Sequence, residues 1–284
     1  MKNQTILTLI GLGSKPSELG PFFERARETS AHLAVIVTGT APPFPISAYS
    51  ASAYGAVAFD DTWQIMYAEG RKKMIAKTEE IEALLATHNV SGDVALAYGE
   101  ARLIEDAIAR RACLCNLVHV SNDLRTDGHA FDHSLRGALF ASPAGVVLNA
   151  IPMREKNGGD HLMIAWDTSL PAARAIQAAL PQIVEASQIT IAVFDPVTTE
   201  TESGENPGSD LAKWLSHMGC KVTVQQYPSG SKEIGACILD RAEELGADLV
   251  VMGAYGHARM RQAMLGGTTR TLIEQTGLPV LLAH

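Results

Sequence analysis

Short apolar runs and helical apolar stripes alternate along the second half of the chain. Residues 162–166, 189–194, 222–227, 249–252 and 280–283 are apolar runs of the length that buried strands have. Between two of them, Ile234, Ile238, Ala242 and Leu245 recur at helical spacing and predict a helix with one buried face. Strands separated by helices favour right-handed crossovers, so the pattern predicts a parallel sheet with helices on both faces.

The first half follows the same plan. It predicts strands and helices in the same alternation, with strands at residues 6–10, 33–38, 93–98, 114–120 and 146–148 and helices at 18–31, 62–88 and 101–111. A repeat of this length indicates two copies of one domain rather than a solenoid of short repeats. The polar, glycine-bearing stretch Pro152–Asp160 is typical of a linker.

We therefore expect an α/β protein of two tandem doubly wound domains, residues 1–152 and residues 153–284. Each domain is predicted to hold a five-stranded, mainly parallel sheet with helices on both faces. The last strands of the two halves, 145–149 and 279–283, are uncharged and apolar, and such edge strands need a partner. We expect them to pair with each other inside the chain, or with the same strand of a second chain.

Composition narrows the class of protein. Of the 284 residues 46% are hydrophobic and 19% charged, as in an ordinary globular protein, and the net charge of −8 argues against nucleic acid as a partner. No apolar run is long enough to span a membrane and no cleavable leader is apparent, so we expect a cytoplasmic protein. The four cysteines form no CxxC pair and are interpreted as small core residues in a reducing compartment.

The strongest candidate for chemistry is a glycine pattern near the C-terminus. Gly253 and Gly256 follow a predicted buried strand, and nine residues later Gly266, Gly267 and Thr268 open a predicted helix. Glycines let backbone N–H groups turn toward an anion, and the helix N-terminus adds positive charge at the same place. The pattern predicts a phosphate cradle for a nucleotide, whereas Gly-x2-Gly by itself is also a common turn.

This spacing resembles the ATP-binding signature of the universal stress protein family, Gly-x2-Gly-x9-Gly followed by Ser or Thr. Here Gly267 stands at the hydroxyl position and Thr268 supplies the first hydroxyl. The resemblance covers the whole chain as two tandem domains, with the signature only in the second. Where the first half would carry its glycines, it has Asp123 and Asp127, whose carboxylates repel phosphate, so we expect a degenerate nucleotide site there.

Asp167 follows the first strand of the second half. Its residue type suits either hydrogen bonds to a nucleoside or the N-cap of the next helix. The resemblance implies that Asp167 contacts the nucleoside, that the backbone of Val193 faces adenine, and that Gly253 lies by the ribose. It further implies phosphate contacts from a second group of residues, Gly256, Gly266, Gly267 and Thr268. Mg²⁺ is expected to arrive with the nucleotide, on phosphate oxygens and water.

The sequence shows no nucleophile elbow, no Walker lysine and no HExxH motif. The resemblance implies an ATP-binding regulatory protein in stress resistance with slow or absent hydrolysis, and further association into a homodimer. Two alternatives stay open. One is a nucleotide-free interaction scaffold, and the other is a slow ATP hydrolase or adenylyl-transfer enzyme that would use His257 and Arg259, which are otherwise solvated loop residues.

Two features of the first half have two interpretations each. Asp127, His129, Asp132 and His133 have the ligand chemistry of a zinc site, but the stretch also suits a polar surface loop. Residues 41–59 form an insert with prolines and aromatic residues, which suits either a pocket cover or a loop packed on the long helix that follows.

Overall fold

The structure of the protein is a computed structural model that describes residues 4–44, 61–150, 160–196, 206–254 and 267–284. By contacts between residues the chain divides into two units, Lys2–Ser142 and Pro143–His284, called here the first unit and the second unit. The predicted linker lies almost wholly outside the described residues. The predicted domain boundary at residue 152 therefore remains a prediction from the sequence repeat.

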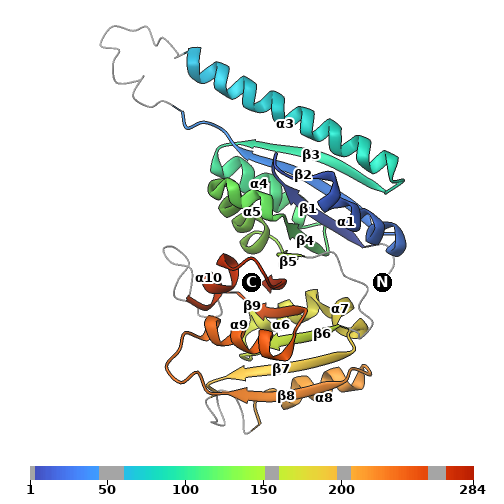
Figure 1. Ribbon diagram of the computed structural model, residues 1–284, viewed down its shortest axis with the longest axis vertical. Coiled ribbons are helices and arrows are strands. Elements are labelled where there is room, and N and C mark those ends of the chain that lie inside the picture. The colour runs from blue at the N-terminus through green and yellow to red at the C-terminus, as the bar shows by residue number, and fades with distance from the viewer. Residues whose placement is uncertain (1–3, 45–60, 151–159, 197–205, 255–266) are drawn as a thin grey trace. The chain divides into compact units, whose positions relative to one another are not determined.

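The first unit alternates strands and helices (Figure 1). In chain order its elements are β1 (Thr5–Ile10), α1 (Pro16–Thr29), β2 (His32–Thr40), α3 (Asp61–Thr87), β3 (Gly92–Gly99), α4 (Ala101–Ala112), β4 (Leu117–Val120), the 3-10 helix η1 (Asn122–Thr126) and α5 (Gly128–Phe140). The four strands are parallel in the order β3-β2-β1-β4. Strand order therefore reverses at β1, which has β2 on one side and β4 on the other.

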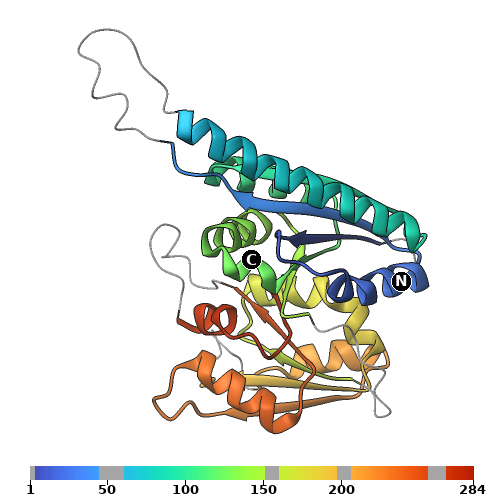
Figure 2. The ribbon, with the colours of Figure 1, turned by 45° about the horizontal axis from the view of Figure 1, so that its top comes forward.

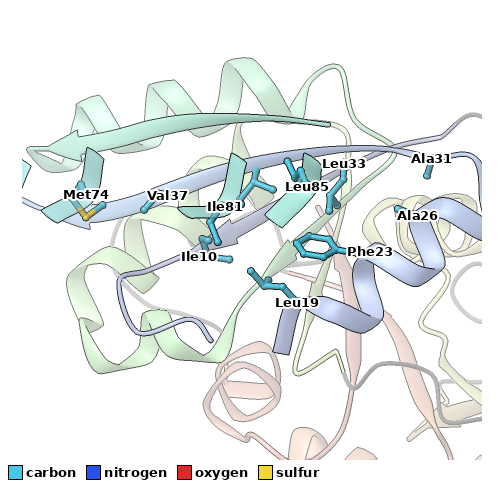
Figure 3. Close-up of a cluster of buried hydrophobic side chains, with 11 residues drawn as sticks. Ile10, Leu19, Phe23, Ala26, Ala31, Leu33, Val37, Met74, Ile81 and Leu85 are labelled. Carbon is cyan, nitrogen blue, oxygen red and sulfur yellow. The ribbon is translucent and has the colours of Figure 1, made fainter. Parts of the chain in front are cut away.

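The core of the first unit lies between its sheet and two helices. Figure 2 shows α3 running along the strands, and Figure 3 shows side chains from α1, α3, β1 and β2 meeting on this face. Phe23, Ile10 and Ile81 have 1% or less of their surface exposed. Burying such side chains contributes roughly 1.5–3 kcal/mol each, so this contact fixes α1 and α3 on the sheet.

The second unit holds β5 (Gly145–Leu148) and all of the later elements. In chain order these are β6 (His161–Ala165), α6 (Leu170–Ala178), α7 (Leu180–Glu185), β7 (Gln188–Phe194), α8 (Ser209–His217), β8 (Val222–Tyr227), α9 (Ile234–Leu245), β9 (Leu249–Gly253), α10 (Gly267–Glu274) and β10 (Val280–Ala283). The strand order is β5-β10-β9-β6-β7-β8. All neighbours are parallel except β5 and β10.

The predicted pairing of the two last strands is confirmed within the chain. β5 and β10 run antiparallel, with Val280 opposite Leu148 and Leu282 opposite Val146. Asn149, directly after β5, donates from Nδ2 to the carbonyl oxygens of Gln275 and Leu278 at 2.9 and 3.1 Å. Each of these apolar edges is therefore covered by the other.

The predicted α/β class is confirmed, and the described residues contribute five strands from each half of the chain. Residues 170–185, between β6 and β7, form two helices rather than one, because Pro181 in the first turn of α7 has no N–H to continue the bonding of α6. Within the described ranges, no helix combines the length and the apolar character that crossing a bilayer requires.

The interpretation of residues 127–133 as a polar loop is wrong. These residues open α5, whose inner face buries Phe131, Leu135 and Leu139. Asp127 is the N-cap of this helix, and its Oδ1 accepts a hydrogen bond from the N–H of Ala130 at 3.1 Å. The interpretation of all four cysteines as core residues is wrong for Cys113, which is exposed.

Candidate functional site

The crevice expected to hold a ligand in the second unit lies where its strand order reverses. That point is β6, with β7 and β8 on one side and β9 and β10 on the other. In open parallel sheets, ligands bind outside the carboxyl ends of the strands at such a point. Ala165 pairs with Met252 across β6 and β9, so the segments that follow these two strands leave the sheet side by side.

Asp167 stands in the segment after β6 and is exposed to solvent. Its Oδ1 accepts a hydrogen bond from the N–H of Ser169 at 3.0 Å, which forms a tight turn, and Thr168 has a positive φ of 63°. The N-cap of α6 is Ser169, whose Oγ accepts from the N–H of Ala172 at 3.2 Å. The alternative role of Asp167 as the N-cap is therefore wrong, and its exposed carboxylate is held in place at the end of β6.

Gly253, the last residue of β9, lies directly against the first turn of α6. A Cβ at this position would lie 2.8 Å from the carbonyl carbon of Pro171 and 2.9 Å from the Cα of Ala172. Both atoms are backbone, so only glycine lets α6 approach β9 this closely. The structure thus gives Gly253 a packing role that its place in the glycine pattern did not reveal.

Val193 lies near the end of β7, and its side chain is 4% exposed. Because that side chain is buried, any contact with a ligand beyond the strand end comes from its backbone. Two residues later, Oδ1 of Asp195 accepts from the N–H of Ser229 at 2.8 Å. This bond ties the end of β7 to the loop after β8, and hydrogen bonds from Ser229 lower the pKa of the Asp195 carboxyl.

The start of α10 faces a carboxylate that sequence reasoning missed. Glu233 caps α9 by accepting from the N–H of Ala236 at 3.0 Å, and it also accepts from the hydroxyl of Thr271 at 3.1 Å. Burial opposes ionisation of Glu233, but hydrogen bonds from backbone N–H groups of α9 and from the hydroxyls of Thr271 and Thr268 lower its pKa. The Thr268 hydroxyl, predicted to face phosphate, is thus bonded to Glu233.

Gly267 is the first residue of α10 and is exposed, as a phosphate contact requires. A Cβ added to it would lie 3.3 Å from Oε1 of Glu233. The sequence carried little signal for Glu233, because Ser, Thr, Asp and Asn are the preferred N-cap residues and glutamate is not among them. Gly256, Gly266, His257 and Arg259 lie outside the described residues, so their assignments stay predictions.

His129 and His133, two of the candidate zinc ligands, lie on α5. The rings of His129 and His133 are stacked with centroids 6.5 Å apart, and Nδ1 of His133 lies 2.9 Å from Oε1 of Glu105. Across the parts of the chain that the structure describes, no three His, Cys, Asp or Glu side chains gather as a metal site would require. The zinc interpretation gains no geometric support from these residues.

Comparison with known proteins finds a family match in the C-terminal part of the chain. Residues 221–284 match the sequence model of the Universal stress protein family. These residues run from β8 to the end of β10 and include the glycine pattern. The resemblance predicted from the sequence is thereby confirmed, and the chain carries a universal stress protein sequence in its C-terminal part.

Two curated relatives match over part of their length. Universal stress protein Slr1230 of Synechocystis is 35% identical over 69 residues, which are 24% of this chain and 23% of that protein. Universal stress protein MJ0577 of Methanocaldococcus jannaschii is 29% identical over 85 residues, or 29% of this chain and 49% of that protein. The chain thus spans about a quarter and about half of the length of these relatives.

Solved structures show the same fold over nearly the whole chain. A universal stress protein from Archaeoglobus fulgidus superposes with a TM-score of 0.60 at 15% identity, covering 98% of this chain and 97% of that one. A putative universal stress protein from Pseudomonas aeruginosa gives a TM-score of 0.58 at 16% identity, covering 99% and 93%. Both halves of this chain therefore share the fold of universal stress proteins.

Proposed function

We propose that the second unit binds ATP at the carboxyl ends of β6 and β9, with Mg²⁺ on the phosphates, and that the chain is a cytoplasmic regulatory protein of the stress response. The observation that carries this proposal is the pairing of β6 with β9. It sets the exposed Asp167 beside the end of the strand that leads into the glycine pattern. A carboxylate on one side and backbone N–H groups on the other suit a nucleoside and its phosphates, respectively.

In this proposal each residue has one role. Asp167 accepts hydrogen bonds from the nucleoside, the backbone of Val193 faces the base, and Gly253 lies by the ribose. Gly256, Gly266 and Gly267 offer N–H groups to the phosphates, and α10 adds the positive end of its dipole. Thr268 contacts the phosphates only if its hydroxyl gives up its hydrogen bond to Glu233 and donates to a phosphate oxygen instead.

A second candidate is a nucleotide-free interaction scaffold, and Glu233 is the observation that favours it. Its carboxylate lies beside the first residue of α10 and already holds hydroxyls of that helix. A negative charge there competes with phosphate for the same helix N-terminus. Tandem domains with a boundary near residue 152 and assembly into a homodimer belong to the same proposal in either case.

Calorimetry on the full chain tests the proposal. MgATP is expected to bind, and Asp167→Ala is expected to weaken binding by roughly tenfold to a hundredfold, since a hydrogen bond to a charged group contributes roughly 1.5–3 kcal/mol. Gly256→Val is expected to weaken it at least as much, because a branched side chain would stand among the N–H groups. Asp210→Asn, an exposed carboxylate on α8, is the control and should bind ATP as the parent does.

Absence of heat with MgATP, while the protein is folded and monodisperse, would reject ATP binding and leave the scaffold candidate. Binding with no turnover over hours supports a regulatory role over slow hydrolysis. If Asp167→Ala binds ATP normally, the nucleotide does not occupy the crevice between β6 and β9.

A further inference from the structure

The first unit has a partly open cavity of about 320 Å³ at the carboxyl ends of its strands. We call it the strand-end cavity. Its wall is formed by the segment after β1, the ends of β2 and β3, η1 with Asp127, and one turn of α3. It lies where strand order reverses around β1, the position at which parallel sheets bind ligands, and its volume suits a small molecule.

Two polar atoms in this wall are buried without a partner among the described residues. Thr38 is 2% exposed, and its Oγ1 makes no hydrogen bond. Asp123 uses Oδ2 to accept from the N–H of Gly11 at 2.9 Å, while its Oδ1 is unpaired. A buried polar group without a partner costs roughly 1–3 kcal/mol, so a ligand that supplies donors here gains that stabilisation.

The charge of the wall selects the sign of the ligand. Asp123 and Asp127 carry two carboxylates, against one ammonium from the exposed Lys73. Asp127 is already occupied, because Oδ2 accepts from the Thr40 hydroxyl at 2.7 Å and Oδ1 caps α5. The wall therefore has a net negative charge and includes the unpaired acceptor of Asp123. A wall of this charge repels phosphate and attracts a cation.

The remaining wall is apolar enough to hold a short carbon chain. Leu12, Met74, Leu124 and the ring of Tyr98 line the cavity beside the polar groups. Leu124 is 1% exposed and Met74 is 1% exposed, so both are fixed parts of the core rather than mobile surface groups. A ligand that combines an ammonium group with a few methylenes matches both parts of the wall.

We propose that the strand-end cavity is a binding site for a small primary amine, whose ammonium group donates to Asp123 Oδ1 and Thr38 Oγ1. This site lies in the first unit and goes beyond the nucleotide site proposed in the second. In the first half, where the glycine pattern is absent, the ligand would thus belong to a different chemical class. No group is transferred, so the proposed role of the site is to bind the amine.

Thermal shift and calorimetry on the full chain test the proposal with primary alkylamines from ethylamine to putrescine. Choline serves as a cation without N–H donors, and sodium chloride at matched ionic strength controls for salt. A primary amine is expected to raise the melting temperature and release heat, and choline is expected to do neither. Asp123→Asn keeps an acceptor for the Gly11 N–H while removing the charge, and should lower amine affinity at least tenfold.

Thr38→Val separates a role of Thr38 in amine binding from a role in stability. Because the Thr38 hydroxyl has no partner, this variant should melt at or above the parent temperature without ligand, yet bind the amine several-fold more weakly. Asp106→Asn, an exposed carboxylate on α4 in the same unit, is the matched control and should change neither measurement.

Three results would overturn the proposal. One is that no primary amine binds above the sodium chloride control. Another is unchanged amine affinity in Asp123→Asn. The third is loss of MgATP binding in Asp123→Asn, which would assign the nucleotide to the first unit. Loss of ATP binding in Asp167→Ala alone bears only on the second unit, so failures of the two proposals are distinguishable.

Discussion

Both units have a carboxylate at the point where strand order reverses, but it follows the central strand in the second unit and the neighbouring strand in the first. In the second unit Asp167 follows the central strand β6 and is exposed, and the neighbouring strand β9 leads into glycines. In the first unit the segment after the central strand β1 begins with Gly11, and Asp123 reaches it from η1, after β4. The same sheet plan therefore presents different chemistry depending on which strand supplies the acid.

The segment after the fourth strand of each half accounts for the difference. In the first unit η1 and α5 follow β4 without a gap large enough for a glycine loop, and Asp127 is bonded to both Thr40 and α5. In the second unit residues 254–266, which include Gly256 and Gly266, separate β9 from α10. The helical connection leaves the strand-end cavity in the first unit, whereas we propose that the glycine connection of the second unit offers N–H groups to phosphate.

The largest expected effect is at Gly253. Gly253→Val would force side-chain atoms into the backbone of Pro171 and Ala172, and we expect at least about 3 kcal/mol of lost stability from the resulting overpacking. The measurement is urea unfolding. Gly20→Ala on α1, where an added Cβ meets nothing within 4 Å, is the matched control and should change stability by under about 1 kcal/mol, because the following Pro21 offsets the usual gain of alanine over glycine in a helix. Equal stability of Gly253→Val and the parent would disprove the close approach of α6.

The next effect is the pH dependence set by His119 on β4 in the first unit. Burial lowers the pKa of this imidazole from its ordinary 6.5 to about 4, and the edge of the Phe22 ring packs against it at 5.1 Å. The unfolded chain binds the proton near pH 6.5 and the folded chain only near pH 4. Stability from the neutral ring is therefore complete above pH 6.5 and is lost as pH falls toward 4, by at most about 3 kcal/mol.

Urea unfolding of the parent and of His119→Gln at pH 7 and at pH 4 checks this dependence. The variant should lose less stability on acidification than the parent, since glutamine does not titrate. Carboxylates such as Asp127 also destabilise the fold on acidification, because their pKa is lowered in the folded state, so only the difference between the two proteins reports on His119. Parallel acid profiles would exclude a neutral buried ring.

A smaller effect compares the two acids that cap helices beside the strand ends. Asp127→Ala removes the cap of α5 and the partner of the Thr40 hydroxyl, and Glu233→Ala removes the cap of α9 and the partner of Thr271. Each should cost about 1–2 kcal/mol. Asp127→Asn keeps the acceptor and should cost under about 0.5 kcal/mol. A larger loss in the Asn variant would mean that charge, not capping, stabilises this turn.

Much of this fold could be predicted from the sequence, because the spacing of apolar residues along a short segment indicates whether that segment is a strand or a helix. Apolar runs such as 189–194 and stripes such as Ile104 and Ile108 specify strands and helices without reference to the rest of the chain. The sequence placed Asp167 and Gly253 at strand ends for the same reason, and the structure sets those ends on neighbouring strands.

What the sequence did not reveal depends on packing between elements. Helix α5 was missed because its first turns carry the polar residues Asp132, which is exposed, and His133, which pairs with Glu105 of α4. These polar residues hide a buried face that becomes apparent only in the packed structure. The bond between Glu233 and the α10 hydroxyls joins residues 38 positions apart. Similarly, glycine is needed at position 253 because α6 packs against it, and the spacing of residues along the sequence does not predict that contact.

The smallest expected effect comes from adding a hydroxyl at position 267, where the signature has Ser or Thr and this chain has glycine. Gly267→Ser adds a Cβ 3.3 Å from the flexible Glu233 carboxylate, which can move aside, so stability should change by under about 0.5 kcal/mol. If the second unit binds ATP, the new hydroxyl should raise MgATP affinity by roughly threefold to tenfold, the range that one hydrogen bond supplies. Gly267→Ala adds the carbon without the hydroxyl and should not raise affinity. Weaker ATP binding in the serine variant than in the alanine variant would show that the hydroxyl turns to Glu233, and that the start of α10 serves the packing of α9 rather than phosphate.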